Sequence, residues 1–365
     1  MPKLIGPVIC RIPLKAARIC CGDDRRLDPH ELYVLGMRYD AVGDYEQAYE
    51  WFRLAADKDV PKAQFMLGNY LYLGRGTRMD QAEAVFWLRK AAILHDADAQ
   101  QLLGKCFDLG TGVPENAEEA ARWYRRAANQ NHPEATADLG DCCFAGRGVK
   151  QNQEEAFRLY QKAARLGDRR GAFCAARCLL EGKGTQRDPH QGIYLLRFAA
   201  ERGHAMAQTQ LGEYYYFGKY VKQSDQEAMR WFSTAAARDV ARGHYWMGIC
   251  YYYGRGTQRD YVEAVRRFRL ADQPTFYEPS YMLGKCYADG KGVPKNERLA
   301  FLHYQKAASA PRSNRIVLEA LANCYQKGFG TQRDAAAAID LRRRAAACAK
   351  LDQDGSAEKA LGIRL

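Results

Sequence analysis

Apolar and polar positions along this chain follow the period of an α-helix and not that of a strand. Small or apolar residues recur three and four positions apart, as in Ala84, Trp87 and Ala91. This spacing places them on one stripe of a helix. No stretch alternates Val, Ile and Thr in the way that half-buried strands do. The pattern therefore predicts an all-α protein with almost no sheet.

Loop glycines mark an internal repeat. The pattern Gly-x-Gly, or its first Gly, recurs every 36 residues, and an eighth copy follows after 38. Glycine suits such loops because they need positive φ. The first glycines are Gly74, Gly110, Gly146, Gly182, Gly218, Gly254, Gly290 and Gly328. A fixed period of this length predicts a solenoid of helical hairpins, each packed against its neighbours.

The first helix of each hairpin, helix A, carries a contact glycine six residues before the loop glycine. A very small side chain there lets a second helix cross at close range. Ala replaces the glycine in two copies. The eight residues are Gly68, Gly104, Gly140, Ala176, Gly212, Gly248, Gly284 and Ala322.

The second helix, helix B, begins six residues after the loop glycine, at a side chain that can accept hydrogen bonds from free amides. These N-caps are Asp80, Asn116, Asn152, Asp188, Ser224, Asp260, Asn296 and Asp334. Three residues further on, six copies carry an acid or amide that would complete a capping box. These are Glu83, Glu119, Glu155, Gln191, Glu227 and Glu263.

Composition and charge limit the partners more than the fold. The chain has 365 residues and a formal net charge of +12, but its basic residues are spread along the sequence, as on a solvated surface. No apolar run could span a bilayer, and the N-terminal residues lack the uninterrupted apolar core of a signal peptide. We therefore expect a cytoplasmic protein that is not transmembrane, although export stays open.

Cysteine is also periodic on helix A, two residues after the contact position. The row consists of Cys106, Cys142, Cys178, Cys250, Cys286 and Cys324. Equivalent points on stacked helices lie about 8 to 10 Å apart, whereas the Cα atoms of a disulfide lie roughly 4.4 to 6.8 Å apart. We therefore predict free, buried thiols, which favours a reducing compartment.

The repeat resembles the Sel-like repeat family, relatives of the tetratricopeptide repeats. The resemblance rests on Ala-x-x-x-Leu-Gly-x-x-Tyr-x-x-Gly-x-Gly, followed by a cap, Ala, an aromatic residue and Ala-Ala. It implies a right-handed α-solenoid, or superhelix, whose A helices line a concave face used by an adaptor protein. The departures are Ala176, Tyr220 in place of the second loop glycine, and Asp272 in place of the second Ala.

The resemblance also divides the chain. Residues 1–28 form an N-terminal extension, and 29–58 resemble a plain tetratricopeptide hairpin without the loop insertion. Residues 59–350 hold eight Sel-like repeats, and 351–365 form a tail.

If tetratricopeptide geometry holds, helix A positions three before, four after and one after the contact residue face the concavity. They are rich in aromatic rings, which predicts a peptide-binding groove with aromatic anchors. The predicted contact residues are Phe65, Tyr72, Lys105, Phe144, Phe173, Arg177, Glu213, Tyr216, Tyr245, Tyr252, Tyr281 and Lys285. The alternative that these rings merely pack between adjacent A helices stays open.

Nothing in the sequence resembles a catalytic motif. It has no His-Glu-x-x-His helix, no Gly-x-Ser-x-Gly elbow and no dinucleotide fingerprint, and its seven histidines are scattered. We expect no enzyme, no cofactor, no metal site and a protein or peptide partner. The first alternative is a basic surface for nucleic acid or anionic lipid, built from Arg75, Arg78, Arg147, Lys150, Arg187, Arg255 and Arg259. A weaker one is an immunity or chaperone partner of a secreted protein.

Overall fold

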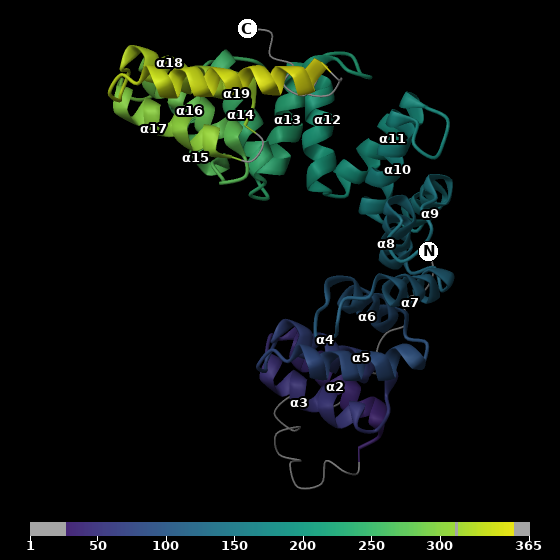
Figure 1. Cartoon of the computed structure of the whole chain (residues 1–365). Coiled ribbons are helices and arrows are strands. Elements are labelled where there is room, and N and C mark those ends of the chain that lie inside the picture. The colour runs from purple at the N-terminus through teal and green to yellow at the C-terminus, as the bar shows by residue number, and fades with distance from the viewer. Residues whose placement is uncertain (1–26, 311–312, 354–365) are drawn as a thin grey trace. The chain divides into compact units, whose positions relative to one another are not determined.

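The computed structural model describes residues 27–310 and 313–353, which form eighteen α-helices, α2 to α19, and no strand (Figure 1). The all-α prediction is confirmed. The chain divides into two compact units, one ending at Gly171 and the other beginning at Ala172. Each unit is described below by itself.

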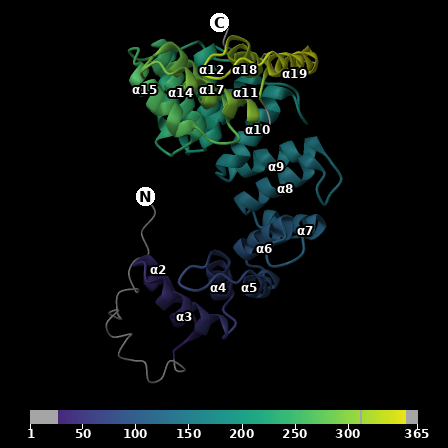
Figure 2. The same cartoon turned by 60° about the vertical axis from the view of Figure 1, so that its left-hand side comes forward.

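Unit 1 consists of four helical hairpins. Its helices are α2 (Pro29–Ala41), α3 (Tyr45–Ala56), α4 (Pro61–Leu73), α5 (Gln81–Ile93), α6 (Ala97–Leu109), α7 (Ala117–Asn129), α8 (Pro133–Ala145) and α9 (Gln153–Arg165). Every helix from α2 to α8 packs on the one that follows it. Figure 2 shows the pairs α4–α5, α6–α7 and α8–α9 in succession.

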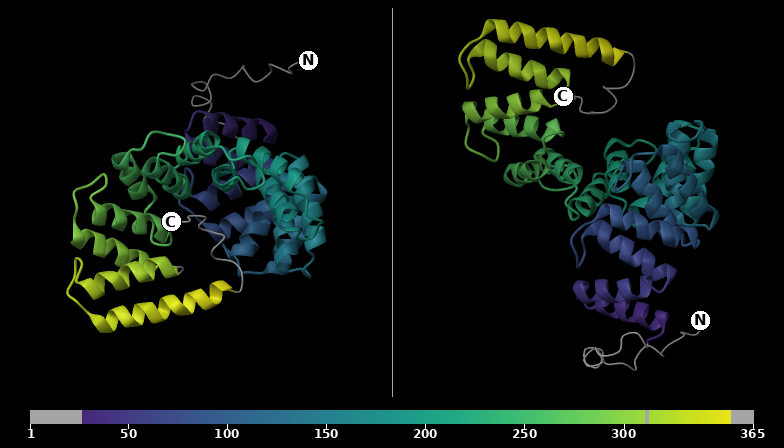
Figure 3. Two further views of the ribbon diagram at one scale, coloured as in Figure 1. Left: turned by 90° about the horizontal axis from the view of Figure 1, so that it is seen from above. Right: turned by 60° about the horizontal axis from the view of Figure 1, so that its bottom comes forward.

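Helix α10 (Arg169–Glu181) contains the boundary between the units. Unit 2 continues with α11 (Pro189–Glu201), α12 (Ala205–Phe217), α13 (Asp225–Ala236), α14 (Ala241–Tyr253), α15 (Tyr261–Ala271), α16 (Tyr277–Asp289), α17 (Glu297–Ser309), α18 (Arg315–Lys327) and α19 (Ala335–Gln353). From α11 to α19 successive helices again pack on one another, and Figure 3 shows the hairpins in layers up to the yellow α19. Even-numbered helices are A helices, and odd-numbered ones are B helices.

The contact glycine lies against a large side chain of the B helix in the same hairpin. A Cβ added at Gly104 would lie 2.7 Å from the ring of Tyr124, and one added at Gly248 would lie 2.5 Å from the ring of Phe268. The ring stands twenty residues after the glycine in both cases. Because the ring occupies the space of a side chain, the two helices approach closely and exclude water from the core between them.

The second loop glycine joins neighbouring hairpins. A Cβ at Gly112 or Gly292 would lie 2.1 Å from the backbone oxygen of Gln81 or Tyr261, at the start of the preceding B helix. Both glycines also have positive φ. Tyr220 stands at this position in one hairpin and holds a φ of 63°, a conformation that is strained for a bulky residue.

All eight predicted N-caps are confirmed, but the prediction of six capping boxes is wrong, because the second hydrogen bond of the box does not form. The cap side chain accepts from a backbone N–H three residues on, as in Asp80 and Glu83 at 2.9 Å. The cap's own N–H, which a box would use, donates instead to a carbonyl of the preceding A helix, for Asp80 that of Leu71. The Glu83 side chain accepts from Trp87 Nε1. A box does form at Asp28 and Glu31, before α2.

Two recurring features of the fold were not predicted. The fourth residue of several A helices is a buried amide, and the Gln100 side chain donates to the Ala92 carbonyl of the preceding B helix at 3.0 Å. The turn between helix B and the next helix A contains one residue with positive φ. These residues are Asp59, His95, Asn131, Gly167, Gly203 and Asp239, each 36 after the last.

Candidate functional site

The aromatic residues predicted to face a groove divide into two sets. Four are buried, and each keeps no more than 6% of its surface exposed: Phe173, Tyr216, Tyr245 and Tyr252. Four are half-buried: Phe65, Tyr72, Phe144 and Tyr281. Among the predicted charged residues, Lys105 and Arg177 are exposed, while Glu213 and Lys285 are half-buried. Packing within the solenoid therefore uses half of the predicted rings, and a role in binding stays a prediction for all of them.

Tyr216 and Tyr252 are covered by cations from the next loop. The Arg255 guanidinium lies 3.6 Å from the centre of the Tyr216 ring, and the Lys291 amine lies 3.2 Å from the Tyr252 hydroxyl. Burial raises the pKa of both phenols above its ordinary value. These two rings join neighbouring repeats, because each cation stands 39 residues after the tyrosine that it contacts.

The basic loop residues of the nucleic-acid alternative are also engaged in part. Arg147 forms an ion pair with Asp108 at 2.8 Å, and Arg75 lies 3.8 Å from the centre of the Tyr45 ring. Arg187 donates to the Leu180 carbonyl. The side chains of Arg78, Lys150 and Arg259 are exposed. The basic surface available to phosphates is therefore smaller than the sequence indicates.

In unit 1 the charged side chains of successive A helices bind one another. Asp98 accepts from the Lys62 amine at 2.9 Å and lies 3.2 Å from the His132 ring. The hydrogen bond from His132, followed by the Lys62 amine, holds the pKa of Asp98 well below its usual range. Further along, Arg170 pairs with both Asp138 and Asp141. These contacts form a charged ladder, defined here as Lys62, Asp98, His132, Asp138, Asp141 and Arg170.

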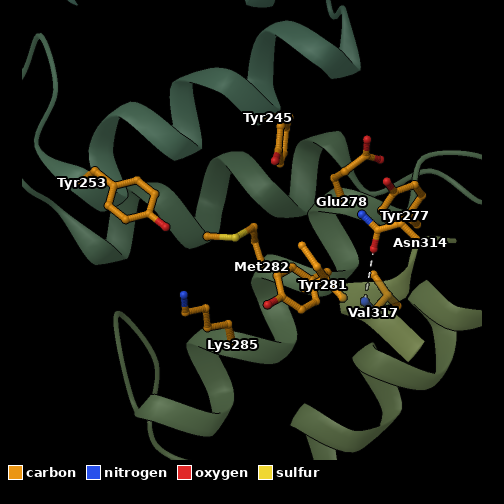
Figure 4. Close-up of a pocket in the computed structure, with 10 residues that line it drawn as sticks. Tyr245, Tyr253, Tyr277, Glu278, Tyr281, Met282, Lys285, Asn314 and Val317 are labelled. Atoms are coloured by element: carbon orange, nitrogen blue, oxygen red, sulfur yellow. Dashed lines mark hydrogen bonds between the residues drawn. The ribbon is translucent and has the colours of Figure 1, made fainter. Parts of the chain in front are cut away.

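In unit 2 the A helices instead form a pocket. It is lined by three consecutive A helices, α14, α16 and α18, and is a shallow hollow with about 50 Å³ of space for the centres of water-sized spheres (Figure 4). Its lining residues are Tyr245, Tyr253, Tyr277, Glu278, Tyr281, Met282, Lys285, Asn314, Ile316 and Val317. Tyr245, Tyr281 and Lys285 were predicted as contact residues. The structure brings these three together, and the predicted residues of unit 1 line no part of this pocket.

The two charges of the pocket lie seven residues apart on α16, Glu278 in its first turn and Lys285 beyond its middle. Figure 4 shows Glu278 beside Tyr277 and Asn314, and Lys285 on the side of Tyr253, with Met282 between them. Neither Glu278 nor Lys285 forms an ion pair with any residue that the structure describes. Burial raises the pKa of Glu278 above its ordinary value.

A cation does lie near Glu278, but another acid binds it. Arg242 pairs with Glu213 at 2.7 Å, and Glu213 also accepts from Trp246 Nε1 at 2.7 Å. Arg242 lowers the pKa of Glu278, while Glu213 raises it. The pocket is thus an apolar and tyrosine-rich hollow with a poorly neutralised acid at one end and an ammonium group at the other. Such a surface can hold an apolar side chain between two charged groups.

The periodic cysteines are buried, as predicted, and reduced in the described part of the chain. Burial raises the pKa of the Cys106 thiol to about 11 and that of Cys250 to about 12. Since the thiolate is the nucleophile and the metal ligand, these thiols are unreactive at neutral pH. No group of three or more potential metal ligands occurs among the residues described.

The fold and this surface define a class, the helical-repeat scaffolds that present side chains along stacked A helices. The Sel1 repeat model matches nine segments, 33–60, 61–96, 97–132, 133–168, 172–204, 205–240, 241–271, 280–311 and 318–349. The chain belongs to the Sel1 repeat family, whose repeats generally mediate protein–protein interactions. The match includes the first hairpin, which lacks the loop insertion.

Solved structures of the same kind superpose on the chain. A Sel1 repeat protein from Oxalobacter formigenes is 30% identical, with a TM-score of 0.62, over 67% of this chain and 98% of its own. A protective antigen present in uropathogenic Escherichia coli strains, which displays an SLR fold, is 26% identical, with a TM-score of 0.54, over 91% of this chain and 81% of its own. No curated protein matches the sequence. Among the described helices, none has both the length and the apolar character needed to cross a membrane.

Proposed function

We propose that this chain is a non-enzymatic scaffold that captures a peptide or protein partner on its A helices, with the pocket of unit 2 as the main contact. The observation that carries the proposal is that three consecutive A helices turn the same side toward one hollow, which is lined by partly exposed tyrosines. Tyrosine is enriched at the centres of protein interfaces because it combines a large apolar ring with a hydroxyl.

The structure changes which predicted residues are the best candidates. Tyr281 and Lys285 are partly open to solvent and line the pocket. Tyr253, which was not among the predicted contact residues, lines it as well. Tyr216 and Tyr252 are occupied by the loop cations described above, so their loss would disturb packing before binding. The remaining predicted residues are kept as contacts of secondary importance. A cytoplasmic location belongs to the same proposal and is supported by the buried thiols.

Replacing Tyr253 with a photo-crosslinking phenylalanine analogue tests the proposal in the full-length chain. We expect crosslinks to a discrete partner in lysate from the native source, and their loss when Tyr281→Ala is added. A matched control replaces Tyr194, which lies 68% exposed on helix α11, with the same analogue. Equal crosslinking to the same proteins from both positions, or none from position 253, would contradict the proposal.

A salt series separates the nucleic-acid and lipid alternative from this proposal. Binding through phosphate contacts weakens steeply as salt rises from 50 to 200 mM, by about 10³-fold or more where several phosphates are contacted. Capture in a tyrosine-lined pocket depends far less on salt. The immunity or chaperone alternative predicts capture in the same pocket, with a secreted protein as the partner.

A further inference from the structure

We propose that the pocket binds a peptide in the polyproline II conformation, with a basic side chain against Glu278, a carboxylate three residues away against Lys285, and proline or another apolar residue between them. This inference rests on the proposed function and specifies the chemistry of the partner. It follows from three features of the pocket: its unpaired acid, the distance between its two charges, and its tyrosines.

The acid at one end of the pocket calls for a cation. Glu278 is half-buried, and no residue in the described ranges forms an ion pair with it. Arg242 is held by Glu213 and offsets only part of the cost of burial, which still raises the pKa of Glu278. A basic side chain that enters the pocket would gain a charge-assisted hydrogen bond with little competition from the protein's own cations.

The spacing of the two charges fits a short peptide in an extended conformation. Glu278 and Lys285 are seven residues apart on α16, which corresponds to about 10.5 Å along the helix axis. In polyproline II every third side chain points the same way, and three residues advance about 9.3 Å. In a β-strand, residues three apart point to opposite faces. A polyproline II segment therefore aligns its first and fourth side chains with the two ends of the pocket.

The tyrosines fit the same ligand. Tyr253, Tyr277 and Tyr281 surround the pocket, and Met282 lies between its charged ends (Figure 4). Grooves lined by aromatic rings bind proline-rich segments, because the rings pack on the flat pyrrolidines and the peptide is already extended before binding. The hydroxyl groups can donate to peptide carbonyls, which have no internal hydrogen bonds in this conformation.

Selection from a phage-displayed library of random dodecapeptides on the full-length chain tests this inference. We expect enriched peptides to carry a basic and an acidic residue at a spacing of three, with proline or apolar residues between. Their affinities are then measured by fluorescence anisotropy. Glu278→Gln and Lys285→Gln should each weaken binding by about tenfold or more, as expected for a lost charged contact in a partly buried site.

The matched control is Glu134→Gln, which should leave peptide affinity unchanged. Glu134 holds the same second position in helix α8 but is exposed and lies outside the pocket. A double variant that exchanges the charges, Glu278→Lys with Lys285→Glu, should prefer peptides with the reversed charge order. Synthetic versions that end at the acidic residue, with a free or an amidated terminus, distinguish a side-chain carboxylate from a terminal one.

The outcomes separate this inference from the proposed function. Enriched peptides that lack the charge pair, or that bind Glu278→Gln as tightly as the parent, overturn the inference. If those peptides still lose affinity in the Tyr253→Ala, Tyr281→Ala double variant, the pocket binds peptides and the proposed function stands. If the double variant retains folded circular dichroism and full affinity, the proposed function fails as well. Failure to enrich any peptide overturns the inference, while the crosslinking experiment still tests the scaffold.

Discussion

The A helices of the two units carry charges at the same helical positions and use them in different ways. In unit 1 the second residue of three A helices, Lys62, Asp98 and Arg170, belongs to the charged ladder, whereas Glu134 at this position of α8 is exposed. In unit 2 the same position holds Arg242, which is paired, and Glu278, which is not paired with any described residue. The frame of the hairpin is therefore constant, while its surface can be either closed by its own ion pairs or left open for a partner.

The largest expected effect tests whether the second loop glycine has the same structural role in both units. Gly112→Ala in unit 1 and Gly292→Ala in unit 2 should each cost about 3 kcal/mol, since both combine positive φ with a clash against a backbone oxygen. Gly43→Ala is the control, because Gly43 has positive φ but no atom within 4 Å of an added Cβ. It should cost only about 1 kcal/mol. Urea denaturation measures the free energy of unfolding of all three variants. Unequal losses for Gly112→Ala and Gly292→Ala would show that the loop contact differs between the two units.

The next effect concerns the charged ladder. Arg170→Met should destabilise unit 1 by about 2 kcal/mol, because Asp138 and Asp141 both lose their cation in a partly exposed setting. Arg242→Met should cost less, since it leaves one carboxylate, that of Glu213, without its cation, whereas Arg170→Met leaves two. Chemical denaturation of the two variants gives the comparison. Equal losses would mean that the ladder is no more tightly coupled than the single pair in unit 2.

Acid titration should then distinguish the two units by the sign of their pH dependence. The pKa of Asp98 is lowered in the folded state, so its stabilisation is present above its unfolded pKa of about 3.9 and is lost as pH falls. The pKa of Glu278 is raised, so its stabilisation is present below about pH 4.3 and is lost as pH rises through the folded pKa.

Asp98→Asn and Glu278→Gln should therefore change the pH profile of unfolding in opposite directions, each by on the order of 1 kcal/mol or less after solvent screening. Asp98→Asn flattens the loss of stability between about pH 5 and 2. Glu278→Gln raises stability at neutral pH relative to the parent. Parallel pH profiles for the two variants would refute the contrast.

The smallest expected effect sharpens the comparison at the surface. Lys285→Gln in unit 2 and Lys105→Gln in unit 1 occupy the same helical position, one residue after the contact glycine. Both should change the free energy of unfolding by less than about 0.5 kcal/mol, because neither lysine forms an ion pair with a described residue. Only Lys285→Gln should affect peptide affinity. A large loss of stability in either variant would assign that lysine a structural role.

The repeat, its loop glycines and its helix caps could be predicted from the sequence, since each depends on local backbone chemistry. The 36-residue spacing placed Gly110 and Gly112 in loops and Asn116 at a cap, and the structure agrees. The capping boxes could not be judged, because the competing acceptor, such as the Leu71 carbonyl for the Asp80 amide, comes from packing between helices.

The candidate site was harder to predict, because exposure depends on the neighbouring repeat. Tyr252 and Tyr281 stand on opposite sides of their contact glycines and looked equivalent, yet a loop cation covers the first while the second lines the pocket. Glu278 and Tyr253 were missed, since they lie three residues before Tyr281 and one residue after Tyr252, outside the three helix A positions that were considered. The amides Gln64, Gln100 and Gln208, which share one position in the repeat, were a usable signal for the contact between helix B and the next helix A, but not for the pocket.

Each loop of this solenoid reaches only to the hairpin before it. Where the 36-residue period is kept, the second loop glycine lies against a carbonyl 31 residues back, as Gly112 does, and the loop cation contacts a side chain 39 residues back. After the two-residue insertion in the last period, Gly330 makes the same approach to a carbonyl 33 residues back. Duplication or loss of a whole 36-residue period in the gene would preserve both intervals at the new junction. The length of such a molecule can therefore change between generations while the contacts between neighbouring hairpins are kept.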